Sequence, residues 1–530
     1  MLEKKKLRLK KFYFHPVTVF LFLIVFTIIL SGILAIFQIQ ATYNVVNPNT
    51  LELEPTLVTV ENLFSFDGIK FIISNATKNF LSFAPLGTLL ISLIGLTVAE
   101  ATGFFEMLTR RHISKYNKYF VTFLVLFISI ISSLINEVGY AILIPLMALI
   151  YFMNNRNPIL GIVTAFCGVS FGFGVSIFVG STEVALINYT KIAAQIIDEN
   201  AHIALSSNLI FIILASIILS IVGTIIIEKI IAPKIGKYKK DEEFAKTEQY
   251  NVLASDEEQQ EIEKEKYEKR GLTYALIVSI VVLFIFIYSL IPNLPYSGML
   301  LDMKERTYLN QLFGDRAYFQ DGFTYIVSLF FILAGIAYGI GSKSLKNDKD
   351  LIEKSSKKLN NIGSIIILMF VVSQFIAVWR KTNIGTIIAI WLTNILEQFQ
   401  LSGVPLIVIT LLFIAIANIF LTSPASKWAI FSPVVVPMFM QSNISPQFAQ
   451  IVMRAGDSMT KGFTPLLASF VIYIGYLNIY NLHKDKPYTI RKSLGMIAPY
   501  FIVISITWIL IVIGWYIIGL PIGPGVLPTI

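Results

Sequence analysis

The stretch from Arg454 to Pro465, RAGDSMTKGFTP, places an arginine, an aspartate and a lysine inside an apolar segment of membrane length. A charged side chain at the bilayer centre costs about 2.5–3.5 kcal/mol on insertion scales, so it normally faces a cavity or a partner. Gly456, Gly462 and Pro465 weaken the helix at the same place, and irregular backbone at that depth is tolerated only where it lines a cavity or is buried in protein. A broken helix that carries charges at this depth is typical of the binding site of a secondary transporter.

Arg454 and Asp457 are three residues apart and share a helix face, so the two side chains either neutralise each other or serve separate functions. The planar fork of Arg454 suits a substrate carboxylate. Asp457 is a candidate for coupling, either by taking up a proton or by holding Na⁺ together with oxygens at the break, for which Ser458 is available. The residue pattern leaves proton and sodium both open.

Composition identifies the elements that must position these charges. Of the 530 residues 55% are hydrophobic and only 14% are charged, which indicates an all-α polytopic membrane protein in a lipid bilayer. The basic residues behind the net charge of +9 lie beside apolar segments, where they set topology, so no nucleic-acid partner is expected. The single cysteine, Cys167, excludes an internal disulfide, and no metal-binding Cys/His spacing or cofactor motif is present.

The apolar pattern predicts one transporter domain over 1–530, with about nine transmembrane helices plus two re-entrant hairpins. The first span covers 16–39, and the order span, polar-centred hairpin, broken span, span then occurs at 80–231 and again at 362–518. The interrupted elements are hairpins at about 119–152 and 404–440 and broken helices at 158–197 and 448–482.

Loop charge predicts the orientation. The basic patch at residues 4–11 places the N-terminus in the cytoplasm, and the C-terminus is then outside. The two copies of the pattern begin on opposite sides, which is the inverted-repeat layout of secondary transporters. Two full spans at 119–152 satisfy the same parity as a re-entrant hairpin. The cytoplasmic charged loop at 234–270 is expected to be a solvated helix or a flexible linker, and 272–341 a connecting pair of spans.

Further polar residues lie at the predicted interruptions. Glu183 follows the first break and is either a proton acceptor or a helix N-cap acid. Ser133 and Asn136 at the tip of the first hairpin are candidate cation and substrate contacts. Trp428 at the second tip either stacks on an aromatic substrate or anchors the hairpin at the membrane interface.

Several motifs resemble the AbgT family of p-aminobenzoyl-glutamate transporters. The second half contains SPASKWAIFSPVVVPMFM, RAGDSMTKGFTP and GLPIGPGVLP, and the first half FAPLGTLLISLIGLTVAEATG, GYAILIPLMAL and GVSFGFGVSIFVGSTE, in the same order as in the family. The resemblance implies a dimer of bowl-like protomers in the cell membrane, each with nine spans and two opposed hairpins. It also implies cation-coupled movement of p-aminobenzoyl-glutamate, a small organic anion, or efflux of antimetabolites such as sulfonamides.

The resemblance places functional positions on particular residues of this chain. They are Trp428, Pro446, Arg454, Asp457 and Pro465.

The chain departs from the family pattern at two positions. The usual aspartate of the first half is Glu183 here, and the usual tip serine is Ala425, with Ser423 and Ser426 beside it as substitutes for its role.

Other classes fit less well. An intramembrane enzyme has no HExxH motif to support it, and an ATP-driven pump has no P-loop string. A channel is expected to carry pore-lining rings rather than single broken helices. Within transporters, the alternative cargo is another organic anion such as a dicarboxylate.

Overall fold

The computed structural model describes residues 14–47, 50–135, 137–238, 257–314, 317–360, 362–483 and 485–530. Within these ranges nine helical segments are long and apolar enough to cross a membrane, which confirms the predicted class of helical polytopic membrane protein. The segments are Pro16–Ile36, Phe66–Ala101, Lys118–Ile135, Leu209–Ile235, Glu263–Tyr288, Tyr318–Gly341, Gly363–Lys381, Gly403–Phe420 and Ile490–Ile518.

The number nine equals the predicted number of spans, but the members differ. The nine include the first arm of each predicted hairpin, at Lys118–Ile135 and Gly403–Phe420. The two predicted broken spans are absent from the nine because the break divides each into helices of 10 to 15 residues. Whether the hairpins are re-entrant in a bilayer stays a prediction.

The first repeat begins with the span α3 (Ala84–Ala101) and continues, after α4 (Phe104–Arg111), with helices around two interruptions. The elements of this continuation are α5 (Lys118–Ile131), the 3₁₀ turn η2 (Ser132–Ile135), α6 (Val138–Met153), α7 (Pro158–Phe171), α8 (Ser181–Gln195), α9 (Leu209–Ile226), the π-helical turn η3 (Ile227–Ile231) and α10 (Ala232–Ile235). Residues 172–180 between α7 and α8 are in neither helix nor strand. Gly168 and Gly172 permit close packing here, since an added Cβ would lie 2.5 Å from Ser129 Cβ and 2.4 Å from Ile130 Cγ1, respectively.

The second repeat follows the same order. Its elements are α16 (Gly363–Lys381), α17 (Ile384–Glu397), α18 (Gly403–Phe420), α19 (Pro424–Gln441), α20 (Pro446–Thr460), the 3₁₀ turn η4 (Lys461–Phe463), α21 (Phe470–Ile479) and α22 (Ile490–Ile518). The predicted long span at 362–396 is divided at Asn383, whose left-handed backbone (φ 61°) separates α16 from α17.

Among the described residues, the two β-strands both lie in the N-terminal part. It runs through α1 (Pro16–Ile36), β1 (Gln40–Val46), β2 (Leu53–Thr59), α2 (Phe66–Leu81), α3 (Ala84–Ala101), α4 (Phe104–Arg111) and the 3₁₀ turn η1 (Ile113–Lys115). The two strands pair antiparallel, with Tyr43 opposite Thr56. The expectation of an all-α chain is wrong for this segment, where threonine, valine and tyrosine favour an extended hairpin that is too short and polar to cross a membrane.

The repeats are linked by a pair of long helices. The elements are α12 (Glu257–Tyr288), α13 (Tyr308–Phe313), α14 (Tyr318–Gly341) and α15 (Asp348–Lys358). Of the charged segment predicted at 234–270, residues 239–256 lie outside the described ranges, and 257–270 form the first part of α12.

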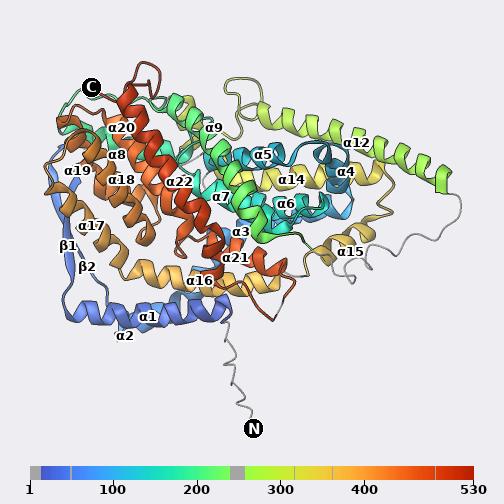
Figure 1. The fold of residues 1–530 in the computed structure, drawn as a ribbon, viewed down its shortest axis with the longest axis horizontal. Helices are drawn as coiled ribbons and strands as arrows, with labels where there is room; N and C mark the ends of the chain where they lie inside the picture. The colour runs from blue at the N-terminus through green and yellow to red at the C-terminus, as the bar shows by residue number, and fades with distance from the viewer. Residues whose placement is uncertain are drawn as a thin grey trace, which may run out of the picture.

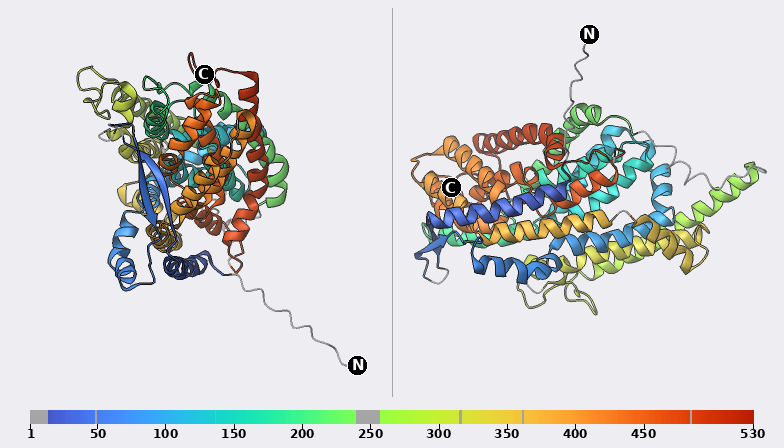
Figure 2. Two further views of the ribbon diagram at one scale, coloured as in Figure 1. Left: turned by 90° about the vertical axis from the view of Figure 1, so that its left-hand side faces the viewer. Right: turned by 90° about the horizontal axis from the view of Figure 1, so that it is seen from below.

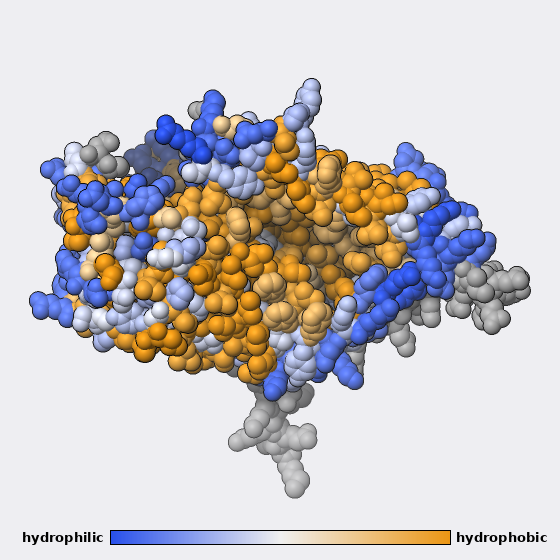
Figure 3. Space-filling view, turned by 90° about the horizontal axis from the view of Figure 1, so that it is seen from above, coloured by the Kyte–Doolittle hydropathy of each residue, from blue (hydrophilic) through white to orange (hydrophobic). Residues whose placement is uncertain are grey.

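In Figure 1 the helices α17 to α20 gather at one end of the molecule and α5, α6 and α14 at the other, with α7, α9 and α22 between them. Figure 2 shows α1 running along α16 beneath this assembly, where Phe20 packs on Phe375 with ring centroids 5.5 Å apart. The largest buried apolar cluster draws side chains from both repeats. Figure 3 shows apolar side chains covering the middle of one face and hydrophilic ones gathered toward its edges.

Candidate functional site

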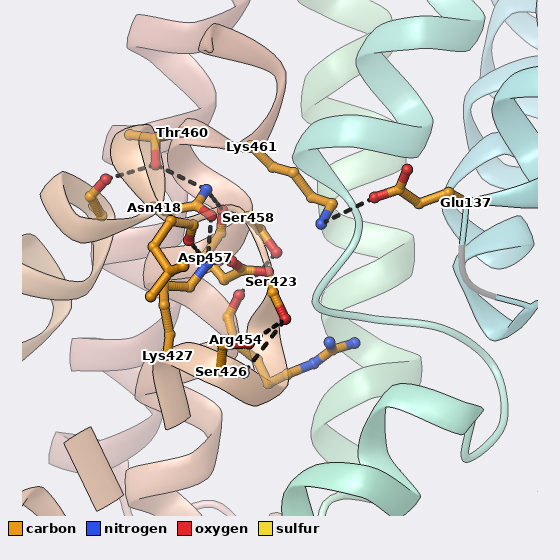
Figure 4. Close-up of polar contacts among 12 residues, drawn as sticks. Glu137, Asn418, Ser423, Ser426, Lys427, Arg454, Asp457, Ser458, Thr460 and Lys461 are labelled. Carbon is orange, nitrogen blue, oxygen red and sulfur yellow. Dashed lines mark hydrogen bonds and ion pairs between the residues drawn. The ribbon is translucent and has the colours of Figure 1, made fainter. Parts of the chain in front are cut away.

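Helix α20 is the element around which the charged residues meet. Ser445 caps its N-terminus by accepting from the Phe448 amide, and Pro446 occupies the first turn. The helix approaches α18 closely at Gly456, where an added Cβ would lie 2.7 Å from the Leu411 carbonyl oxygen. Each charged residue of α20 and η4 pairs with a different neighbouring element, as Figure 4 shows in part.

The first pair joins α20 to the tip of the second hairpin. Lys427 Nζ lies 2.5 Å from Asp457 Oδ1, and both side chains are about 1% exposed. The same ammonium donates to Asn418 Oδ1 at 2.5 Å and to the Leu421 carbonyl at 2.9 Å. Asn418 in turn donates to the Asp457 carbonyl at 2.7 Å. Lys427 lies in the first turns of α19, where the helix dipole disfavours a cation, so these oxygens must compensate its charge.

The second pair joins α20 to the first broken helix. Arg454 Nη2 lies 2.6 Å from Glu183 Oε1 and donates to the Phe173 carbonyl at 2.7 Å. Within the described residues, Arg454 Nε and Nη1 are buried and have no hydrogen-bond partner. Glu183 Oε2 also accepts from the Gly180 amide, so this carboxylate caps α8 and neutralises Arg454 at the same time.

The third pair reaches the tip of the first hairpin. Lys461 Nζ lies 3.7 Å from Glu137 Oε1, and Glu137 also accepts from the Ser469 hydroxyl at 2.8 Å. Lys461 Nζ is 3.7 Å from the centre of the Phe173 ring, which the Arg454 guanidinium approaches at 5.3 Å. Phe173 therefore lies against two of the three cations, in the geometry of cation–π contacts.

These contacts answer the question of whether Arg454 and Asp457 neutralise each other. They do not, because Arg454 pairs with Glu183 and Asp457 with Lys427. Figure 4 shows the Arg454 side chain turned away from Lys427 and Asp457. The explanation is that each charge is oriented by a different packed neighbour, which a helix-face argument from sequence does not include.

The predicted hydroxyl ligands are engaged with the backbone. Ser133 donates to the Val175 carbonyl at 2.7 Å, which ties the first hairpin tip to the unwound segment before α8. Ser458 donates to the Arg454 carbonyl at 2.8 Å and Thr460 to the Ala415 carbonyl at 2.7 Å. These contacts brace the site, and the predicted coupling role of Ser133 and Ser458 stays a prediction.

Trp428 and Pro465 lie in the second half of the same core. Trp428 is fully buried and donates to Thr190 Oγ1 at 2.8 Å, so the alternative of an exposed interfacial anchor is wrong. Pro465 lies in the irregular segment between η4 and α21. Asn136, the remaining predicted contact, lies outside the described residues.

Ser423 and Ser426 line a cavity of about 350 Å³ beside the charged core. Ser423 caps α19 and accepts from the Ser426 hydroxyl at 2.9 Å. The cavity extends to Arg380 and Asn383 at the break between α16 and α17. The two serines thus line this cavity at the N-terminal end of α19.

Two residues that sequence reasoning did not assign are central to this geometry, namely Lys427 and Asn418. The signal for Lys427 was present, because an ionisable residue inside an apolar hairpin is by itself a functional indication. Asn418 gave only a weak signal as one amide in an apolar helix.

The string GVSFG at residues 168–172 matches the G-x-S-x-G pattern of hydrolase nucleophile elbows, and the structure excludes that role. Ser170 lies inside helix α7 rather than on a strand-to-helix turn, and its oxygen accepts from the Tyr140 hydroxyl at 3.0 Å. No group of three or more His, Cys, Asp or Glu residues capable of holding a metal occurs in the part of the chain that the structure describes.

Paired charges on interrupted helices inside a polytopic fold define the class of membrane transporter. The chain matches the family model described as "AbgT putative transporter family" over residues 9–530, and it belongs to this family. It is therefore a transporter and not an enzyme.

Individual relatives agree in length. The p-aminobenzoyl-glutamate transport protein of Escherichia coli K12 is 31% identical over 516 residues, which cover 97% of this chain and 94% of that protein. The solved YdaH transporter of Alcanivorax borkumensis is 26% identical, with coverage of 96% of this chain and 100% of that chain and a TM-score of 0.46. MtrF of Neisseria gonorrhoeae, described with a class of antimetabolite efflux pumps, is 29% identical, with coverage of 97% and 98% and a TM-score of 0.46.

Proposed function

We propose that this chain is a cation-coupled secondary transporter of p-aminobenzoyl-glutamate or of a related aromatic organic anion, including antimetabolites such as sulfonamides. The name of the Escherichia coli relative supports the first cargo. The observation that carries the proposal is the set of three ion pairs through which α20 and η4 contact both hairpins and the first broken helix.

Arg454 is the proposed contact for a substrate carboxylate. Its Nη2 holds Glu183, whereas Nε and Nη1, which lie on different edges of the guanidinium, lack a partner within the described residues. A carboxylate that accepts from either donor gains a charge-assisted hydrogen bond in a buried site. The Phe173 ring beside Arg454 supplies aromatic surface for a benzoyl ring, and Trp428, which the resemblance to the family implies, is the second proposed aromatic contact.

Asp457 is the proposed coupling residue. Its Oδ1 holds Lys427, and its Oδ2 is buried without a hydrogen-bond partner in the described ranges. An unpartnered carboxylate oxygen at this depth is costly, so a cation or a proton that binds it stabilises the site. Binding there weakens the hold of Asp457 on Lys427 and thereby links cation uptake to movement of the second hairpin.

Flux measurements on purified protein in liposomes test this function. Saturable movement of labelled p-aminobenzoyl-glutamate is expected under a Na⁺ or a pH gradient, imposed separately and in both directions. Asp457→Asn should abolish it, whereas the exposed Asp348→Asn on α15 is the matched control and should retain it. Absence of wild-type flux under every gradient and in both directions would show that p-aminobenzoyl-glutamate is not a substrate. Stronger competition by a plain dicarboxylate than by an aromatic anion would favour the alternative substrate class.

We further propose that the protein acts as a homodimer in the cell membrane, with the N-terminus in the cytoplasm and the C-terminus outside. The basic residues at 4–11 support this orientation. Native mass spectrometry of the full chain should give twice the monomer mass, and a reporter fused after Ile530 should be active only outside. A monomeric mass, or a reporter active only in the cytoplasm, would contradict the respective statement.

A further inference from the structure

We propose that the second hairpin contains a monovalent-cation site that the chain fills with its own Lys427 ammonium, and that Na⁺ enters this site only when Lys427 is replaced. The inference deepens the proposed function, on which it rests, by identifying what occupies the cation position beside Asp457. It follows that Na⁺ does not bind in this cage in the wild type.

The geometry around Lys427 is that of a cation in an oxygen cage. A lysine ammonium has three N–H donors, and the three oxygens that Nζ contacts use all of them. The three are Asn418 Oδ1 at 2.5 Å, Asp457 Oδ1 at 2.5 Å and the Leu421 carbonyl oxygen at 2.9 Å.

These oxygens are of the kind that hard cations bind. A carboxylate, a side-chain amide oxygen and a backbone carbonyl at a helix interruption are typical ligands of hard alkali and alkaline-earth cations. Asp457 Oδ2 has no hydrogen-bond partner within the described residues, so a small cation could be held by both carboxylate oxygens. The cage is also shielded from bulk solvent, because Lys427, Asn418 and Asp457 are all fully buried.

The other nearby cations do not substitute for Lys427. Arg454 is held by Glu183 at 2.6 Å, and Lys461 by Glu137 at 3.7 Å. Removing the Lys427 ammonium therefore leaves the cage with one uncompensated negative charge in a low-dielectric interior. A single monovalent cation restores neutrality, and Na⁺ is small enough to fit where the NH₃⁺ group was.

The experiment compares Na⁺ with N-methyl-D-glucamine at constant ionic strength and at pH 8. Thermal unfolding midpoints and binding of ²²Na⁺ are measured on the full chain in detergent. Wild type should show no saturable ²²Na⁺ binding and the same midpoint in both salts. Lys427→Met and Lys427→Ala should bind ²²Na⁺ saturably, and Na⁺ should raise their midpoints.

Two variants serve as matched controls. Lys461→Met removes a buried lysine but leaves the cage filled, so Na⁺ should have no effect on its midpoint. The double variant Lys427→Met/Asp457→Asn removes both charges and should also be indifferent to Na⁺. Recovery of a Lys427 variant only in sodium buffers supports the site in the same way as binding does.

Three results would overturn the inference. The first is saturable ²²Na⁺ binding to wild type that Asp457→Asn removes, since the cage would then hold Na⁺ beside Lys427. The second is a folded Lys427→Ala protein that binds no Na⁺, and the third is loss of both Lys427 variants in sodium and glucamine buffers alike. These readouts need no transport, so a wild type without flux would contradict the proposed function and leave this result standing.

Discussion

The two hairpin tips occupy corresponding places in the two repeats, yet they are held in opposite ways. The first tip presents an acid, Glu137, to Lys461 at 3.7 Å, and the Glu137 side chain is 38% exposed. The second presents a base, Lys427, to Asp457 at 2.5 Å, and both side chains are about 1% exposed. At the first tip only the acid is exposed, because the Lys461 side chain is fully buried, whereas at the second tip both partners are buried and breaking the pair is costly. The repeats thus share their layout, but the ion pair of the second tip is shorter and more completely buried than that of the first.

The largest expected effect is on the buried pair of the second tip. In Na⁺-free buffer Lys427→Met or Asp457→Asn alone should lower the free energy of unfolding by about 3–5 kcal/mol, because each leaves the partner buried and unpaired. The double variant should recover much of this loss. Chemical denaturation followed by tryptophan fluorescence measures all three. Strictly additive losses would show that the two side chains do not interact as the comparison requires.

Next in size is the effect on the link between the repeats at Arg454. Arg454→Lys keeps the charge but loses the planar fork that bridges Glu183 and the Phe173 carbonyl, so the KM for p-aminobenzoyl-glutamate should rise about tenfold or more. Initial rates in liposomes over a range of substrate concentrations give the KM. The exposed Arg491→Lys is the matched control. An unchanged KM in Arg454→Lys would show that the guanidinium of Arg454 does not bind the substrate.

A smaller effect is expected where the unwound segment of the first repeat touches α20. An alanine Cβ at Gly174 would lie 2.5 Å from Ser458 Oγ and 2.6 Å from the Arg454 carbonyl oxygen, so overpacking should cost about 1–3 kcal/mol. Gly514→Ala in α22, where an added Cβ meets nothing within 4 Å, should be neutral or stabilising. Unfolding midpoints of the two variants are compared directly. Equal midpoints would mean that the unwound segment and α20 can move apart to accommodate the added methyl group without loss of stability.

The smallest effect belongs to the first tip. Glu137→Gln retains an acceptor for Ser469 and loses a charge contact of 3.7 Å with the buried Lys461. Because the acid itself is 38% exposed, the loss in the free energy of unfolding should be smaller than that of Lys427→Met. The difference in the free energy of unfolding between wild type and Glu137→Gln should become smaller in high salt. Unfolding measured at low and high ionic strength provides the test. A loss as large as that of Lys427→Met would remove the asymmetry between the tips.

Much of this arrangement is readable from the sequence. The repeated order of apolar segments and interruptions places Arg454, Asp457 and Glu183 on elements that meet, because breaks and charges at membrane depth need shared burial. The bounds of α18 to α21 also fall close to the predicted hairpin at 404–440 and the broken helix at 448–482.

The pairing of charges is not readable in this way. A helix-face rule brings Arg454 and Asp457 together, but their partners come from α8 and α19, which are distant in sequence. The family motif assigns a role to Trp428 but not to the neighbouring Lys427, although burying a charged lysine has the larger effect on the free energy of folding. The β1–β2 hairpin was missed because seven-residue strands in a polar connection give too short a pattern.

The burial of Cys167 has a practical consequence for measuring conformational changes in this protein. The chain holds one cysteine, and its side chain is inaccessible inside α7. A maleimide dye added to the folded protein should therefore report almost entirely on a cysteine introduced elsewhere, without prior removal of the native thiol. Labels at the two tips, one at a time, would then show which hairpin becomes reachable from each side of a vesicle as cargo passes.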